Sequence, residues 1–134
     1  MGTTILDTNI YISAFFWGGK PKQILRMAID GKITIAMSFA QYEELRRVLT
    51  YEKFSLSEKQ QEVILTSIVN VVDIIDAPRK EDMIKEDPSD NMILDIAAIT
   101  AADCIVSGDN HLLSLKEYKG IPILTPSRFL IVTK

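Results

Sequence analysis

Four acidic residues in this chain have the types and positions needed to bind a metal ion together: Asp7, Glu44, Asp90 and Asp109. Asp7 ends an apolar, β-prone run that begins at Thr3, and Asp109 closely follows a second apolar run. In open parallel sheets ligands bind at the C-terminal ends of the strands, so we expect these two carboxylates at one edge. Grouped carboxylates repel one another unless a hard cation with oxygen ligands lies between them. The pattern therefore predicts a site for a divalent cation.

The other two acids are predicted to lie on helices. Asp90 heads the apolar stripe of a predicted helix over 90–102 and should point toward the sheet. A lone carboxylate there is costly to bury unless it caps the helix or binds a cation. Asp95 lies about 140° further around that helix, so we expect it in solvent. Glu44 flanks the apolar face of a predicted helix over 39–50, and spacing alone leaves Glu43 as an alternative.

Each strand-end acid also has a purely structural interpretation. Asp7 could be an N-cap, and Asp109 could belong to a Gly-Asp-Asn turn. His111, the only histidine, is predicted to be a surface residue at a helix N-terminus and not a ligand or base. The chain has no Cys/His cluster, which argues against zinc.

Helix and strand patterns alternate along the chain and give the acids a common scaffold. Buried strands are predicted at 3–7, 33–37, 71–75, 104–107 and 121–124. Helices are predicted at 9–16, 22–29, 39–50, from 57 onward, 90–102 and 110–115, with a polar surface loop over 79–88. This alternation predicts a parallel sheet covered by helices on both faces, built as one domain over residues 1–134.

Composition limits the class of protein. The chain has 134 residues, 47% of them hydrophobic, and a formal net charge of −3. A negative net charge argues against a nucleic-acid binder, because such proteins usually carry a basic surface. Cations bound by the clustered carboxylates would weaken this argument. No apolar run approaches the ~20 residues that cross a membrane. Cys104 is the single cysteine and is expected to be a buried thiol. We therefore expect a cytoplasmic protein with no membrane association.

Four motifs, in this order, resemble the PIN domain family: Ile5-Leu6-Asp7-Thr8-Asn9, Glu44-Leu45, Asp87-Pro88-Ser89-Asp90-Asn91 and Ser107-Gly108-Asp109-Asn110-His111-Leu112-Leu113. The resemblance covers essentially the whole chain. It is closest to the small PIN proteins assigned as toxins of prokaryotic toxin–antitoxin pairs, the VapC-like group.

The resemblance implies a three-layer α/β/α sandwich with a central parallel sheet and an acidic pocket that binds one or two Mg²⁺ or Mn²⁺ ions. It implies metal-dependent endoribonuclease activity on RNA phosphodiesters. By motif, the metal-binding and catalytic acids are Asp7, Glu44, Asp90 and Asp109. The accompanying polar positions are Asn9, Ser107, Asp87 and Asn91. It also implies an antitoxin partner that covers the site, and a homodimer.

The sequence offers candidate side chains for RNA binding but no contact to a particular base. Lys20, Lys22 and Arg46 are the candidate RNA-binding cations, and Phe16 and Trp17 are candidates for stacking on unpaired bases.

Two other classes of protein were weighed. A phosphoacceptor signalling domain would have a lysine at the end of its last strand, where this chain has Thr125-Pro126. The remaining alternative is a non-catalytic metal- or RNA-binding module with the same fold, which metal-dependent turnover would distinguish from the enzyme.

Overall fold

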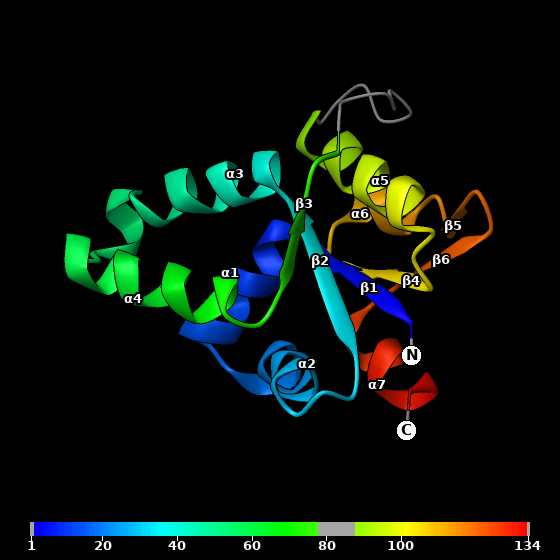
Figure 1. Cartoon of the computed structure of the whole chain (residues 1–134), viewed down its shortest axis with the longest axis horizontal. Helices are drawn as coiled ribbons and strands as arrows, with labels where there is room; N and C mark the ends of the chain where they lie inside the picture. Colours follow the sequence, from blue (N-terminus) through cyan, green and yellow to red (C-terminus); the bar gives the residue numbers. More distant parts are fainter. Residues whose placement is uncertain (1, 78–87, 134) are drawn as a thin grey trace.

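The computed structural model describes residues 2–77 and 88–133. Six strands form one sheet in the order β3-β2-β1-β4-β6-β5 (Figure 1). The strands are β1 (Thr3–Leu6), β2 (Thr34–Ser38), β3 (Asp73–Ile75), β4 (Cys104–Val106), β5 (Glu117–Tyr118) and β6 (Ile121–Leu124). Pairing is parallel from β3 to β6, and only β5 joins the sheet antiparallel, at its edge. The C-terminal ends of β1 and β4 therefore lie side by side.

Helices cover both faces of this sheet. They are α1 (Thr8–Phe16), α2 (Gly19–Ile29), α3 (Phe39–Leu49), α4 (Glu58–Val69), α5 (Pro88–Thr100), α6 (Asn110–Leu113) and α7 (Pro126–Val132), with a short 3₁₀ helix η1 (Glu52–Phe54). Figure 1 shows α3 and α4 extending together beyond the sheet, and α5 and α6 lying over β1 and β4.

The strand residues alternate between two hydrophobic cores. Leu6 and Val106 join one core with residues of α1 to α4 and α7, whereas Ile5 and Ile105 join the other with residues of α5 and α6. Successive side chains of a strand point to opposite faces, so a strand that is apolar throughout has to be covered on both sides. The predicted three-layer α/β/α arrangement is confirmed.

Local signals in the sequence place most helix starts correctly. Ser38 caps α3 by accepting a hydrogen bond from Gln41 N at 3.0 Å. Ser57 and Gln60 form the reciprocal capping box that opens α4. These caps satisfy backbone N–H groups that no helical carbonyl can reach.

Some elements differ from the prediction. The short strand β5, the helix α7 and η1 were not predicted. In α4, Val63 is exposed and Leu65 is buried against the core. The predicted loop over 79–88 falls on residues that lie almost entirely outside the described part of the chain.

Candidate metal centre

A small polar pocket lies at the C-terminal edge of β1 and β4. Its volume is about 170 Å³, and its lining residues are Asp7, Thr8, Asn9, Glu44, Val48, Ser89, Asp90, Ile93 and Asp109. All four acids predicted from the sequence line it. We call it the acidic pocket. The four acids come from four parts of the chain: the end of β1, α3, the first turn of α5, and the segment between β4 and α6.

Asp7 is held in place by two hydrogen bonds. Its Oδ1 caps α1 by accepting from Ile10 N at 3.1 Å, and its Oδ2 accepts from the hydroxyl of Ser107. The side chain is only 5% exposed. Burial raises its pKa above the usual value near 3.8, and the charge of Asp109 raises it further, whereas the bonds from Ser107 and Ile10 act in the opposite direction. The N-cap interpretation of Asp7 is therefore correct, and the same carboxylate also faces the pocket.

Glu44 is oriented across the pocket by Thr8. The Thr8 hydroxyl donates a hydrogen bond to Glu44 Oε1, which ties α3 to the N-terminus of α1. Glu43 instead pairs with Arg46, with 2.7 Å between Oε2 and Nη2, and both side chains are exposed. The choice that spacing left open is resolved: Glu44 lines the acidic pocket and Glu43 does not.

Asp90 and Asp109 approach each other at the other side of the pocket. Asp90 is 6% exposed, and Asp109 caps α6 by accepting from His111 N at 2.7 Å. His111 Nδ1 lies 3.9 Å from Asp90 Oδ2 and 3.8 Å from Asp109 Oδ1. Ligand atoms of these three residues fall within 4.8 Å of one another, close enough to share one cation. His111 is exposed at a helix N-terminus, as predicted, but sequence reasoning missed its position beside two of the acids.

The predicted supporting residues have different positions. Ser107 is fully buried; it donates to Asp7 and accepts from Asp109 N at 2.9 Å, so it links two of the acids. Asn9 lines the pocket, whereas Asn91 is buried and is not among the lining residues. Asp87 lies outside the described residues.

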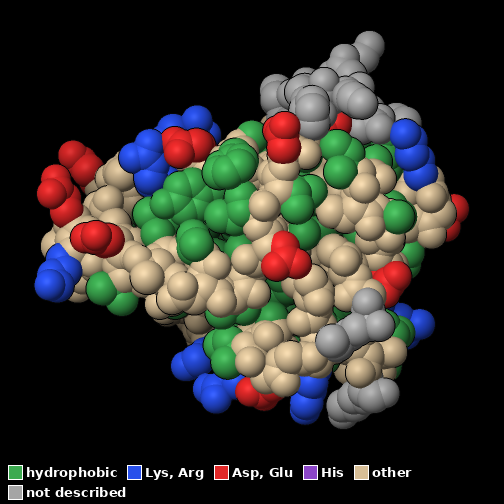
Figure 2. Space-filling model, in the orientation of Figure 1, with side chains coloured by type: hydrophobic (Ala, Val, Ile, Leu, Met, Phe, Trp, Pro, Cys, Tyr) green, Lys and Arg blue, Asp and Glu red, His purple; other side chains and the backbone are tan. Residues whose placement is uncertain are grey.

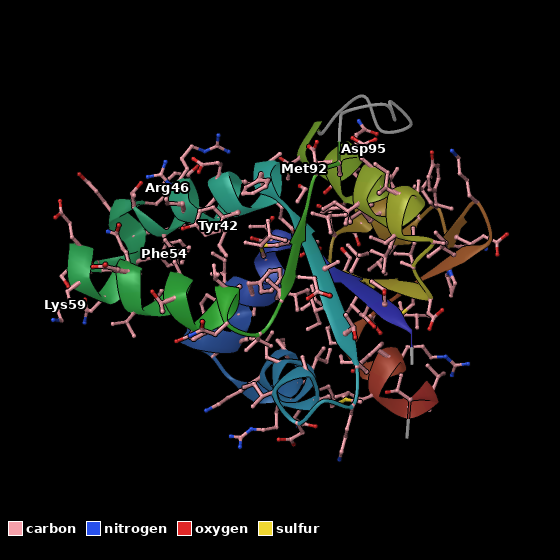
Figure 3. The ribbon with its side chains drawn as sticks, viewed as in Figure 1. Tyr42, Arg46, Phe54, Lys59, Met92 and Asp95 are labelled. Carbon is pink, nitrogen blue, oxygen red and sulfur yellow. The ribbon has the colours of Figure 1, made fainter. Side chains whose placement is uncertain are left out.

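The predicted RNA-binding cations do not line the acidic pocket. Lys20 and Lys22 are exposed in the first turn of α2. Arg46 points away from the sheet on the outer side of α3 (Figure 3), where its pairing with Glu43 raises the pKa of its guanidinium. Arg46 lines a larger neighbouring groove of about 780 Å³, which shares Glu44 and Ser89 with the acidic pocket.

The prediction for Asp95 is wrong. Its side chain is only 3% exposed and faces the groove between α3 and α5. Ideal helical geometry gives the angle between Asp90 and Asp95, but that angle does not show which elements pack against Asp95. Here α3 covers a flank of α5 that the sequence pattern leaves polar.

Two further lining residues, Thr8 and Ser89, were not singled out as site residues. Each is directly next to a predicted acid in the sequence. Their position beside Asp7 and Asp90 is the one signal that points to them. The hydrogen bond from Thr8 to Glu44 spans 36 positions, so no local pattern could reveal it.

Comparisons with known proteins identify the fold and the family of the chain. The crystal structure of VapBC2 from Rickettsia felis, bound to a DNA fragment from its promoter, contains a chain with a similar fold. The TM-score is 0.66 at 20% identity, and the match covers 90% of this chain and 96% of that one. Among curated proteins, none matches the chain significantly. The model of the PIN domain family matches residues 3–111, which include all four acids, and the chain therefore belongs to the PIN domain family.

Proposed function

We propose that this chain is a metal-dependent endoribonuclease of the VapC-like toxin group, formed by one PIN domain over residues 1–134. The observation that carries the proposal is the convergence of Asp7, Glu44, Asp90 and Asp109 on one pocket in a chain of this family.

The donor set fits a hard divalent cation. Asp7 and Asp90 are nearly excluded from solvent, and the charge of Asp109 acts unfavourably on Asp7. A cation removes that cost, and carboxylate oxygens are the ligands that Mg²⁺ and Mn²⁺ prefer. The four acids would hold one or two such ions, with the imidazole of His111 as a further donor in reach of Asp90 and Asp109.

The protein's own contribution to the reaction is positioning. When bound, the metal supplies charge neutralisation at the phosphate and lowers the pKa of a bound water. Ser107 fixes Asp7 and the backbone before α6, and Thr8 fixes Glu44. Because these hydrogen bonds are made before substrate arrives, the acids need little reorganisation when the phosphate binds.

The proposed place in the VapC-like group also predicts the partners and the cellular location of the protein. The fold shared with a chain of the VapBC2 structure supports an antitoxin protein as partner. The VapC-like resemblance implies a homodimer. No helix in the described residues has the length and apolar character needed to span a bilayer. We place the proposed activity in the cytoplasm, where thiols stay reduced, because the single cysteine, Cys104, is a free, buried thiol.

The test is cleavage of a mixed pool of structured and single-stranded RNAs by purified wild type and Asp90→Asn, in Mn²⁺, Mg²⁺ or EDTA. We expect wild-type cleavage that EDTA abolishes and that Asp90→Asn reduces at least 100-fold, about the loss that removing one electrostatic contributor causes in other enzymes. Asp30→Asn, an exposed aspartate at the end of α2, is the matched control and should cleave like wild type.

The neighbouring glutamates provide a second matched pair. Glu44→Gln should lose activity and Glu43→Gln should not, because only Glu44 lines the acidic pocket. Equal cleavage by wild type and Asp90→Asn would overturn the proposal. Mn²⁺ binding without cleavage of any RNA would favour the non-catalytic module instead.

A further inference from the structure

A second pocket lies along the same helix that Asp7 caps. It has a volume of about 580 Å³, and its lining residues are Asn9, Ile12, Ser13, Phe16, Trp17, Lys53 and Phe54. We call it the aromatic pocket. Asn9, Ile12, Ser13 and Phe16 recur at the spacing of one helix face, so one stripe of α1 forms its wall. The size is typical of pockets that hold small organic groups.

The aromatic pocket has a fixed floor and an exposed aromatic side chain beside it. Phe16 and Phe54 stack with ring centroids 4.8 Å apart and planes inclined by 22°, and both pack against the hydrophobic core. In Figure 3 Phe54 lies on the inner side of α3, in the space that α4 closes. Trp17, at the C-terminal end of α1, is 74% exposed, with its ring centroid 6.0 Å from that of Phe16. An exposed tryptophan beside a fixed aromatic floor is an arrangement suited to stacking on a flat ring.

Asn9 connects this pocket to the acidic pocket, because its side chain lines both. From Asn9 to Phe16 is about 10 Å along the helix axis. A nucleotide close to a phosphate held in the acidic pocket can therefore reach the aromatic pocket.

The charge at the rim favours a nucleotide over a peptide. The ammonium of Lys53 lies 5.2 Å from the centre of the Phe54 ring, at the edge of the pocket, where it can contact a phosphate. Lysine is depleted at the cores of protein–protein interfaces, whereas cations next to aromatic platforms are typical of single-strand binding sites. Figure 2 shows basic and acidic side chains intermixed around the outer ends of α2, α3 and α4, so Lys53 is the cation that favours a nucleotide here.

We propose that the aromatic pocket binds an unpaired base of the RNA substrate close to the scissile phosphate, by stacking on Trp17 and Phe16. This inference rests on the proposed nuclease function and adds to it a base-binding subsite beside the acidic pocket. Trp17 would then be a residue that determines specificity.

Trp17 is the only tryptophan in the chain, so its fluorescence reports on the pocket alone. The probe is a single-stranded adenine RNA octamer, titrated in EDTA so that no cleavage occurs, with an abasic octamer of the same charge as comparison. We expect the adenine octamer to quench Trp17 and the abasic octamer to leave it unchanged.

Variants test the affinity by anisotropy of the labelled octamer. Trp17→Ala should weaken binding about tenfold or more, and Trp17→Phe should recover most of that loss, since stacking on one aromatic side chain is worth this much. Lys53→Gln should weaken the salt dependence of binding. Phe39→Ala is the matched control: it removes an aromatic side chain that is 62% exposed but lines neither pocket.

Several results would overturn the inference. Absence of quenching, or equal binding by wild type and Trp17→Ala, excludes base stacking here. If Trp17→Ala instead releases a co-purified protein partner and leaves RNA binding intact, the pocket belongs to a protein interface. Cleavage of RNA that is independent of Trp17 overturns this inference and leaves the nuclease standing. Quenching by RNA without cleavage in any metal overturns the nuclease and leaves the stacking site standing.

Discussion

At the scale of single residues, a carboxylate that is buried near another acid gains from a bound cation and is costly without one. Asp7 shows this most clearly, because it is buried, caps a helix, accepts from Ser107 and lies near the charge of Asp109. In the metal-free protein its carboxylate lacks solvent and faces a like charge. A site that binds cations strongly is in this way destabilised when the cation is absent.

We predict that Asp7→Asn stabilises the metal-free protein near neutral pH. The pKa of Asp7 is raised in the folded state, so its favourable contribution is present below the unfolded value near 3.8 and is lost as the pH rises through the folded value. Asparagine carries no charge and caps helices as well as aspartate does. We expect a Tm increase of about 4 °C in EDTA at pH 7, the size of change that ~1 kcal/mol gives in a domain of this length.

Adding Mn²⁺ to wild type and to Asp7→Asn is the control for this prediction. Mn²⁺ should raise the Tm of wild type and leave that of Asp7→Asn almost unchanged, because ligand binding stabilises only a protein that binds it. Thermal unfolding followed by circular dichroism measures both. A lower Tm for Asp7→Asn in EDTA at pH 7 would show that the hydrogen bonds of the carboxylate outweigh its burial.

At the scale of elements, side-chain caps fix where five of the described helices begin. Asp7, Ser38, Ser57, Asp109 and Thr125 all accept hydrogen bonds from the first turn of the helix that follows. Two of these five caps are also acids of the pocket. The proposed metal site and helix initiation therefore share two carboxylates. A substitution at a cap far from the pocket tests helix initiation alone.

We predict that Ser57→Ala lowers stability without affecting the site. The substitution removes the capping box at the start of α4 and should cost about 1 kcal/mol. Ser67→Ala on the same helix is the control, because its exposed hydroxyl only bonds back to Val63 O and its loss should change stability by less than ~0.5 kcal/mol. Denaturant unfolding measures both variants. Equal stability of the two would contradict a role for the cap.

At the scale of the whole molecule, two hydrophobic cores hold the sheet between layers of helices. The core beneath α5 is the smaller of the two and supports the helix that carries Asp90. A defect in that core should therefore affect both stability and the acidic pocket. The other core, beneath α1 to α4, positions Asp7 and Glu44.

We predict that Ile96→Ala destabilises the protein by roughly 2–5 kcal/mol, the usual cost of a cavity at a fully buried isoleucine. Ile99→Ala is the matched control on the same helix, because Ile99 is 46% exposed and its loss should cost less than ~1 kcal/mol. Chemical denaturation gives both values. A comparable loss from the two substitutions would mean that α5 does not pack as described.

The sequence by itself determined the alternation of helices and strands, and it placed Asp7, Asp90 and Asp109 at strand ends or at a helix start. It could do so because strand periodicity, capping and strand-end carboxylates are local patterns, readable within a few residues. Only the tertiary structure decided which glutamate faces the pocket, that Asp95 is buried, that Thr8 holds Glu44 and that His111 lies beside Asp90 and Asp109. The contacts of Thr8 with Glu44 and of His111 with Asp90 join residues far apart in the chain. They depend on how α3, α5 and α6 pack over the sheet, which no local pattern of residues records.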